Sequence, residues 1–154
     1  MYLYLIQHAE AAGKEEDPRR GLNAAGRAAA KKAAAFFKRQ HPEIHVIWHS
    51  GKARAEQTAG ILAEALGMGQ RVMVHTGLAP NDDIRAVKET LEKSGQNNIA
   101  IVGHLPYLGR LAAALLAGGG ESGPVRFRPG GIVCLAREES RWEVAWAVIP
   151  EILV

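Results

Sequence analysis

The sequence predicts an α/β fold, a three-layer α/β/α sandwich around a mostly parallel central sheet. Short apolar runs rich in β-forming residues alternate with alanine- and leucine-rich segments that have helical periodicity. Strands that alternate with helices form largely parallel sheets that are covered on both faces. The chain has 154 residues, 47% of them hydrophobic, which suffices for one domain with its own core. We therefore expect a single domain spanning residues 1–154.

The first half of the chain contains three predicted strands and two predicted helices. Asn23 is a good N-cap for an alanine-rich helix that closes with basic residues before Pro42. Gly67 is a typical end for the second helix, which carries apolar residues on one face. The expected strands are 2–6, 44–48 and 72–74, the expected helices 24–39 and 54–66, and the expected loops 9–21 and 49–53.

The second half continues the alternation and then changes to two consecutive strands. Pro106 is placed to open a helix, and a glycine-rich segment after it reads as a flexible connector. The expected helices are about 84–93 and 106–117. The expected strands are 98–102 and, near the end of the chain, 132–136 and 142–148. The loop 78–83 precedes the first of these helices, and the connector covers 118–124.

Composition excludes several classes of protein. The single cysteine, Cys134, allows no internal disulfide and lies in a predicted strand, so we expect an inert core thiol in a cytoplasmic protein. The N-terminus lacks the pattern of a signal peptide, and the longest apolar run, 111–117, is too short to span a membrane. The net charge of +3 suits an anionic ligand, but scattered basic residues and few aromatics do not predict nucleic-acid binding.

Polar side chains follow three of the predicted strands. Gln7 and His8 follow the first strand, Ser50 the second and His104 the fourth. Ligands of such folds bind outside the carboxyl ends of the strands. We therefore expect these residues to converge on one edge of the sheet, although either histidine alone is also compatible with a simple surface residue.

The segment around Arg54 favours a phosphate site. It places an arginine in the first turn of a helix, after a loop that contains Ser50 and Lys52. Helix N-termini offer unpaired N–H groups to anions, and a guanidinium can bind a phosphoryl group through two parallel hydrogen bonds. The alternative is an ordinary surface arginine. A zinc site at His45 and His49 is not expected, because four residues on a strand span roughly 13 Å.

Three segments resemble the signature segments of the histidine phosphatase superfamily. They are Leu5-Ile6-Gln7-His8-Ala9-Glu10-Ala11, Ser50 to Ala59 with Arg54-Ala55-Glu56-Gln57-Thr58-Ala59, and Ile101-Val102-Gly103-His104-Leu105-Pro106. The small size, the Arg20-Gly21-Leu22-Asn23 stretch and the loop 78–83 are closest to the SixA-type phosphohistidine phosphatase branch. The resemblance covers nearly the whole chain and implies a phosphoglycerate-mutase-like fold.

The resemblance also implies a mechanism. His8 attacks phosphorus and carries a phosphohistidine intermediate, Arg54 and His104 bind the phosphoryl oxygens, and Arg20 lies near the same pocket. The substrate is phosphohistidine in a protein, such as a phosphotransfer domain in signal transduction, and neither metal nor cofactor is needed. Elementary chemistry adds that an attacking imidazole needs one bare ring nitrogen, so its other nitrogen must be held as a donor, typically by a backbone carbonyl.

Two positions depart from the family pattern. Gln7 replaces the usual arginine before the nucleophile, and Ala9 replaces the usual glycine after it. Loss of one charge-assisted hydrogen bond costs about 1.5–3 kcal/mol of phosphate stabilisation, for which Lys52 or Arg20 are the candidate replacements. A small-molecule phosphomonoesterase and a slow or non-catalytic phosphate-binding regulatory module therefore stay open as alternatives.

Asp82 and Asp83 are the candidate general acids, in the loop before the third helix. A poor alkoxide leaving group needs such an acid, whereas the imidazole of phosphohistidine is basic enough to be protonated near neutral pH. Both residues are equally suited to capping the helix that follows, which makes a structural role the stronger interpretation of the pair.

Overall fold

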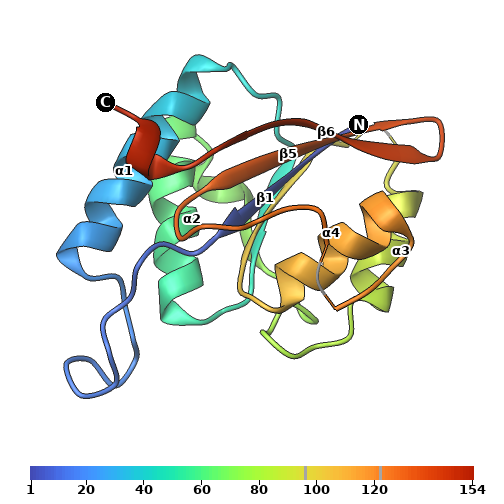
Figure 1. The fold of residues 1–154 in the computed structure, drawn as a ribbon. Coiled ribbons are helices and arrows are strands. Elements are labelled where there is room, and N and C mark those ends of the chain that lie inside the picture. The colour runs from blue at the N-terminus through green and yellow to red at the C-terminus, as the bar shows by residue number, and fades with distance from the viewer. Residues whose placement is uncertain (96, 122) are drawn as a thin grey trace.

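The computed structural model describes residues 1–95, 97–121 and 123–154. Within them lies a six-stranded sheet with the order β3-β2-β4-β1-β5-β6 (Figure 1). The first four strands in this order pair in parallel, β5 runs antiparallel to β1, and β6 runs antiparallel to β5. The strands are β1 (Tyr2–Gln7), β2 (Val46–His49), β3 (Val72–Val74), β4 (Ile99–Gly103), β5 (Ile132–Glu138) and β6 (Arg141–Val148).

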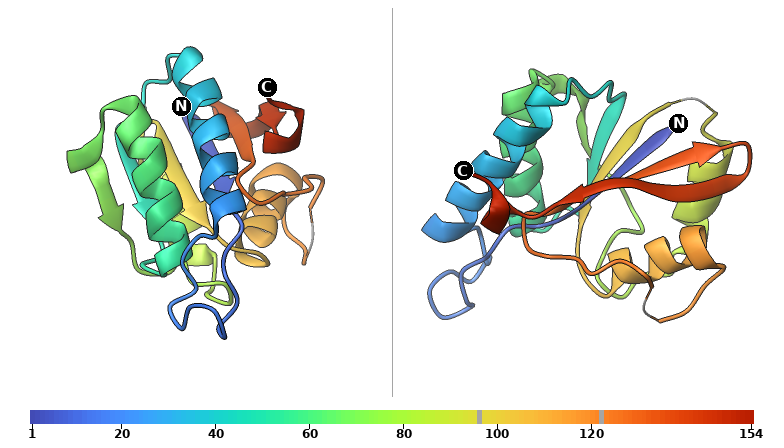
Figure 2. Two further views of the ribbon diagram at one scale, coloured as in Figure 1. Left: turned by 90° about the vertical axis from the view of Figure 1, so that its left-hand side faces the viewer. Right: turned by 45° about the horizontal axis from the view of Figure 1, so that its top comes forward.

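Four helices cover the two faces of the sheet and complete a three-layer α/β/α sandwich. The helices α1 (Ala24–Arg39) and α2 (Ala53–Leu66) lie side by side on one face (Figure 2). The helices α3 (Arg85–Lys93) and α4 (Tyr107–Ala117) lie on the other. Short 3₁₀ turns, η1 (Gly69–Arg71) and η2 (Pro150–Ile152), follow α2 and β6. The predicted fold class is therefore confirmed.

The core divides at the sheet because successive side chains of a strand point to opposite faces. On β1, Tyr4 and Ile6 pack in the cluster under α1 and α2, whereas Leu3 and Leu5 pack in the cluster under α3 and α4. All four are buried. This central strand thus reads as one continuous apolar run, as expected for a strand that is covered on both faces.

Every predicted helix and strand is present, with bounds that differ by at most two residues. At β2, Ile44 and His45 were expected in the strand but precede it. His45 N–H still donates to the Asn98 carbonyl at 2.8 Å, so the chain approaches β4 before the regular ladder begins. Residue 122 of the expected connector lies outside the described residues.

The predicted helix ends are confirmed. The Asn23 side chain accepts a hydrogen bond from Gly26 N–H at 2.7 Å, as an N-cap does. Gly67 ends α2 in the left-handed conformation, with φ of 69°.

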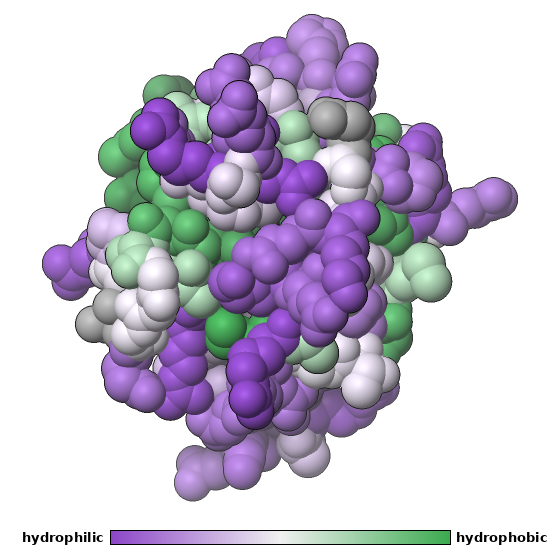
Figure 3. All heavy atoms as spheres, turned by 90° about the vertical axis from the view of Figure 1, so that its right-hand side faces the viewer, coloured by the Kyte–Doolittle hydropathy of each residue, from purple (hydrophilic) through white to green (hydrophobic). Residues whose placement is uncertain are grey.

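The face over α3 and α4 is mostly hydrophilic, with apolar areas between the polar ones (Figure 3). Among the described residues, none of the helices combines the length and the apolar character that a membrane span requires.

Two helical glycines offer a matched test of the packing between the β1–α1 loop and α1. A Cβ on Gly26 would collide with the Glu10 carbonyl oxygen, whereas a Cβ on Gly60 in α2 meets nothing within 4 Å. We expect Gly26→Ala to lower the free energy of unfolding by about 1–3 kcal/mol through overpacking. Gly60→Ala should raise it by about 0.5–1 kcal/mol through helix propensity. Urea denaturation measures both, and equal gains would contradict the packing of the loop on α1.

Candidate active site

The carboxyl ends of β1, β4 and β2 bring the two predicted histidines and Ser50 together. His8 N–H donates to the Gly103 carbonyl at 2.9 Å, so the two strands end side by side. The ring centroids of His8 and His104 lie 5.0 Å apart. Ser50 Oγ lies 2.6 Å from His104 Nε2. The segments that connect β1 to α1, β2 to α2 and β4 to α4 thus meet at one edge of the sheet.

The backbone fixes the tautomer of His8. Its Nδ1 lies 2.7 Å from the Ala9 carbonyl oxygen. A carbonyl oxygen can only accept, so Nδ1 carries the proton and Nε2 presents its lone pair. Burial lowers the pKa of His8, the bond to the Ala9 carbonyl opposes this, and the charges of Arg54 and Arg20 lower it further. His8 is therefore a neutral imidazole with a bare nitrogen, as a nucleophile requires.

His104 is also held neutral. Its side chain is buried, and burial, His8, Arg54 and Lys52 together lower its pKa from 6.5 to about 3. Nε2 interacts with Ser50, while Nδ1 is buried without a hydrogen-bond partner in the described part of the chain. A neutral imidazole in this place can donate one hydrogen bond to a phosphoryl oxygen without adding charge.

Arg54 lies in the first turn of α2, and Lys52 is the N-cap residue of that helix. Burial and the charge of Arg20 lower the pKa of Arg54. Thr58, one turn along α2, is buried and donates from its hydroxyl to the Arg54 carbonyl at 2.8 Å. The same hydroxyl accepts from Ala9 N–H at 3.0 Å. Thr58 therefore joins the nucleophile's loop to the arginine's helix.

Sequence reasoning missed this role of Thr58. The available signal was its position four residues after Arg54, which places a hydroxyl on the inner face of α2. Gln57 has a related role, since its Oε1 accepts from Leu22 N–H at 2.7 Å and so holds the β1–α1 loop against α2.

Arg20 lies on that loop in a strained conformation. Its φ is +52°, in the left-handed region that costs a residue with a Cβ about 1–2 kcal/mol. Its Nε donates to the Ala12 carbonyl at 3.2 Å. The charge of Arg20 contributes to the lowered pKa values of both His8 and Arg54.

Gln7 is the last residue of β1, and its carbonyl accepts from Gly130 N–H at 2.9 Å. Its side-chain Oε1 is buried without a hydrogen bond in the part of the chain that the structure describes. A buried acceptor left unpaired costs about 1–3 kcal/mol. The position where the family usually has an arginine thus holds a neutral amide whose oxygen has no hydrogen bond.

The structure gives Asp82 and Asp83 local roles. The Asp82 carboxylate accepts from Ala79 N–H at 2.9 Å, within its own loop. Asp83 accepts from Arg85 N–H at 2.9 Å at the start of α3 and pairs with the Arg85 guanidinium at 2.6 Å. Among the described residues, no hydrogen bond joins either carboxylate to His8 or His104. These contacts favour the structural interpretation over the general acid.

The site as a whole is cationic around two neutral imidazoles. Every charged side chain that perturbs the pKa of His104 or Arg54 is basic, and a dianionic phosphoryl group would be attracted by all of them. Within the described ranges, no group of three or more His, Cys, Asp or Glu side chains could hold a metal ion.

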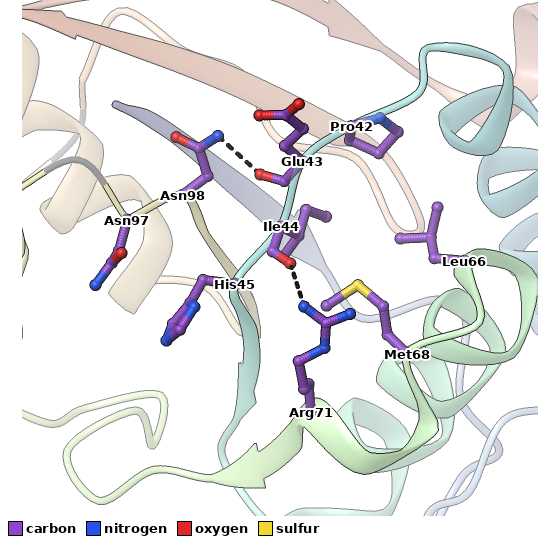
Figure 4. Close-up of a pocket in the computed structure, with 9 residues that line it drawn as sticks. All are labelled: Pro42, Glu43, Ile44, His45, Leu66, Met68, Arg71, Asn97 and Asn98. Carbon is purple, nitrogen blue, oxygen red and sulfur yellow. Dashed lines mark hydrogen bonds between the residues drawn. The ribbon is translucent and has the colours of Figure 1, made fainter.

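A separate pocket of about 440 Å³ lies at the amino ends of β2 and β4 (Figure 4). Two polar side chains of this pocket bind backbone carbonyl groups. Arg71 donates to the Ile44 carbonyl at 3.4 Å, and Asn98 donates to the Glu43 carbonyl at 2.7 Å. It is lined by neither catalytic candidate histidine, and it lies at the end of the sheet opposite to the His8–His104 pair.

Comparison with known proteins identifies the family of the chain. Residues 3–79 match the model of the histidine phosphatase superfamily (branch 1). The chain is 28% identical to the phosphohistidine phosphatase SixA of Escherichia coli K12 over 144 residues, which cover 91% of this chain and 88% of that protein. It is 34% identical to an uncharacterized Picosynechococcus protein over 124 residues, which cover 77% and 74% of the two chains.

Solved structures share the fold of this chain. The structure of the protein histidine phosphatase SixA complexed with tungstate superposes with a TM-score of 0.85 at 26% identity and covers 97% of both chains. A putative SixA from Agrobacterium tumefaciens has a TM-score of 0.79 at 24% identity, again over 97% of both chains, and supports the fold.

The low pKa of His104 predicts a dependence of stability on pH. Below pH 6.5 His104 is protonated in the unfolded chain, whereas in the folded chain it stays neutral down to about pH 3. The free energy of unfolding should therefore fall as pH falls through this window, by up to about 1.4 kcal/mol per pH unit from this residue. Urea denaturation in phosphate-free buffers between pH 7 and 4.5 measures the slope. His104→Asn should flatten it, whereas His45→Asn at the far end of the sheet should keep it; equal slopes in all three proteins would contradict the assignment.

Proposed function

The chain belongs to the histidine phosphatase superfamily, within its SixA-type branch, and from this we propose that residues 1–154 form one domain that removes phosphate from phosphohistidine in proteins. The observation that carries the proposal is His8, whose Nδ1 is held by the Ala9 carbonyl and whose ring lies 5.0 Å from that of His104. The proposal extends to a cytoplasmic role in signal transduction, with a phosphotransfer domain as partner.

The first chemical step forms a bond between His8 Nε2 and phosphorus and breaks the bond between phosphorus and the substrate nitrogen. The departing imidazole keeps the bonding electron pair and a proton, because protonated phosphoimidazole is the leaving form near neutral pH. Arg54, His104 and the nearby cations Arg20 and Lys52 stabilise the negative charge on the equatorial oxygens, which supplies most of the catalysis in phosphoryl transfer.

The second step returns His8 to its starting state. A water attacks the phosphorus of the phosphorylated His8, inorganic phosphate leaves, and Nε2 regains its lone pair. The Ala9 carbonyl keeps the proton on Nδ1 throughout, so the ring neither rotates nor changes tautomer. We propose that neither step needs a metal or a cofactor.

Two observations support phosphohistidine over phosphate esters. Asp82 and Asp83, the two candidate acids, are engaged in their own loop and with Arg85, so neither is held in position to protonate an alkoxide. Leu105, directly after His104, is 43% exposed, so the rim of the site presents an apolar side chain to an approaching macromolecule. The E. coli relative is itself named a phosphohistidine phosphatase.

The nucleophile can be tested directly. His8→Ala should lower the release of phosphate from a phosphohistidine-bearing phosphotransfer domain by about three orders of magnitude or more, because the covalent route is lost. Wild-type protein mixed with radiolabelled substrate and quenched in alkali should retain label on its own histidine. His45→Ala is the matched control and should behave as wild type. Equal rates for wild type and His8→Ala would refute the mechanism, and faster turnover of small phosphate esters would favour a phosphomonoesterase.

The unpaired amide of Gln7 favours one second candidate, a phosphate-binding regulatory module with little turnover. Gln7→Arg separates the two. If the protein is a phosphatase, the added charge-assisted bond should raise kcat/KM by about 10-fold or more, which corresponds to about 1.5–3 kcal/mol. An inert wild type and an active Gln7→Arg variant would establish the module instead. Steady-state kinetics on the same phosphotransfer domain, with anion affinity measured in parallel, decide between them.

A further inference from the structure

The loop between β1 and α1 is fixed by hydrogen bonds to the helix that carries Arg54. It leaves the sheet at His8, projects beyond the start of α1 (Figure 1) and folds back on itself, with Ala12 N–H donating to the Gly21 carbonyl at 2.8 Å. Leu22 N–H donates to Gln57 and Ala9 N–H to Thr58, both on α2. The loop is thereby fixed to the helix that carries Arg54.

Arg20 occupies the one position of this loop with a positive φ on a residue that has a Cβ. The next residue, Gly21, could adopt a positive φ without strain, yet it is Arg20 that has the positive φ. Gly21 is required for space, since a Cβ there would lie 2.9 Å from Gln57 Nε2 and 3.0 Å from Asp17 Oδ2. The chain therefore retains an arginine where glycine is the favoured residue, which is typical of a constraint set by function.

Asp17 holds this strained turn from one side. Its Oδ1 accepts from Arg19 N–H at 3.0 Å and its Oδ2 from Gly21 N–H at 2.8 Å. Its backbone carbonyl accepts from Arg20 N–H at 2.9 Å. One residue thus satisfies three consecutive N–H groups centred on Arg20 and fixes the backbone on both sides of it.

The side chain of Arg20 is oriented as well. Its Nε donates to the Ala12 carbonyl on the opposite side of the loop at 3.2 Å. This bond sets the plane of the guanidinium and uses Nε alone, while the two Nη groups carry the paired donors that suit a phosphoryl group.

We propose that Asp17 is a positioning residue that holds Arg20 in its left-handed conformation, so that Arg20 supplies to the phosphoryl group the second guanidinium that Gln7 does not. The inference rests on the proposed function of the site and names a residue outside its catalytic set. Asp17 acts through Arg20 and does not touch the substrate. The charge of Arg20 already reaches the site in the free protein, where it lowers the pKa of both His8 and Arg54.

A double-mutant cycle tests this coupling. Asp17→Ala should lower kcat/KM on the phosphohistidine domain about tenfold, mainly through KM, and weaken the affinity for tungstate or inorganic phosphate by a similar factor. Asp17→Asn keeps one of the two side-chain acceptors and should fall between. In an Arg20→Gly background, Asp17→Ala should change neither quantity further, because the group that it positions is gone.

Thermal unfolding of the same variants separates positioning from folding. Arg20→Gly should bind anion more weakly than wild type and yet unfold at the same or a higher temperature, since glycine adopts positive φ without strain. Glu16→Ala is the matched control, because it removes an exposed acid from the same loop and should leave kinetics and anion affinity unchanged.

The outcomes separate this inference from the proposed function. An equal loss from Asp17→Ala in the wild-type and Arg20→Gly backgrounds would overturn the positioning role, as would a loss no greater than that of Glu16→Ala. If the wild type shows no turnover above His8→Ala, the proposed function fails. The cycle in anion affinity then still decides whether Asp17 acts through Arg20.

Discussion

The site depends on one pairing, that of β1 with β4 in parallel, with Gln7 opposite Gly103. His8 and His104 directly follow these two residues. Because the two strands end side by side, the register brings the two imidazole rings together. β2 pairs with β4 on its other side, which adds Ser50 and the start of α2. A slip of β1 by one residue would turn Leu5 and Ile6 to the wrong faces and carry His8 away from His104. The packing of the core therefore enforces the geometry of the site.

The electrostatics of the site follow from its burial. Desolvation keeps both imidazoles neutral, and the neighbouring arginines strengthen the effect. The cations that would repel an imidazolium are the same groups that attract a phosphoryl dianion. The free protein thus stores unfavourable interactions between like charges, which a bound anion relieves, and it also carries the strained backbone at Arg20. Such opposition between stability and function is the usual pattern at sites that must bind charge.

The sequence could predict the parts of this arrangement that depend on local patterns. Alternating apolar runs identified the strands, Asn23 and Gly67 identified helix ends, and strand-terminal polar residues identified His8, Ser50 and His104. The sequence could not predict contacts made across the fold. Nothing local distinguishes Thr58 as the link between Ala9 and Arg54, or Asp17 as the acceptor for three N–H groups. The left-handed backbone of Arg20 was also hidden, because propensity places glycine there and a neighbouring glycine is present.

At Gln7 a charge is absent from a partly buried position, although a hydrogen-bond donor is kept. At position 7 a guanidinium would lie at the end of a central strand, close to the other cations, and would pay a desolvation cost there. Glutamine avoids that cost, but Oε1 stays unpaired in the free protein. In our proposal the charge is instead supplied from the loop, where Arg20 is only partly buried and so avoids the desolvation cost of a fully buried guanidinium.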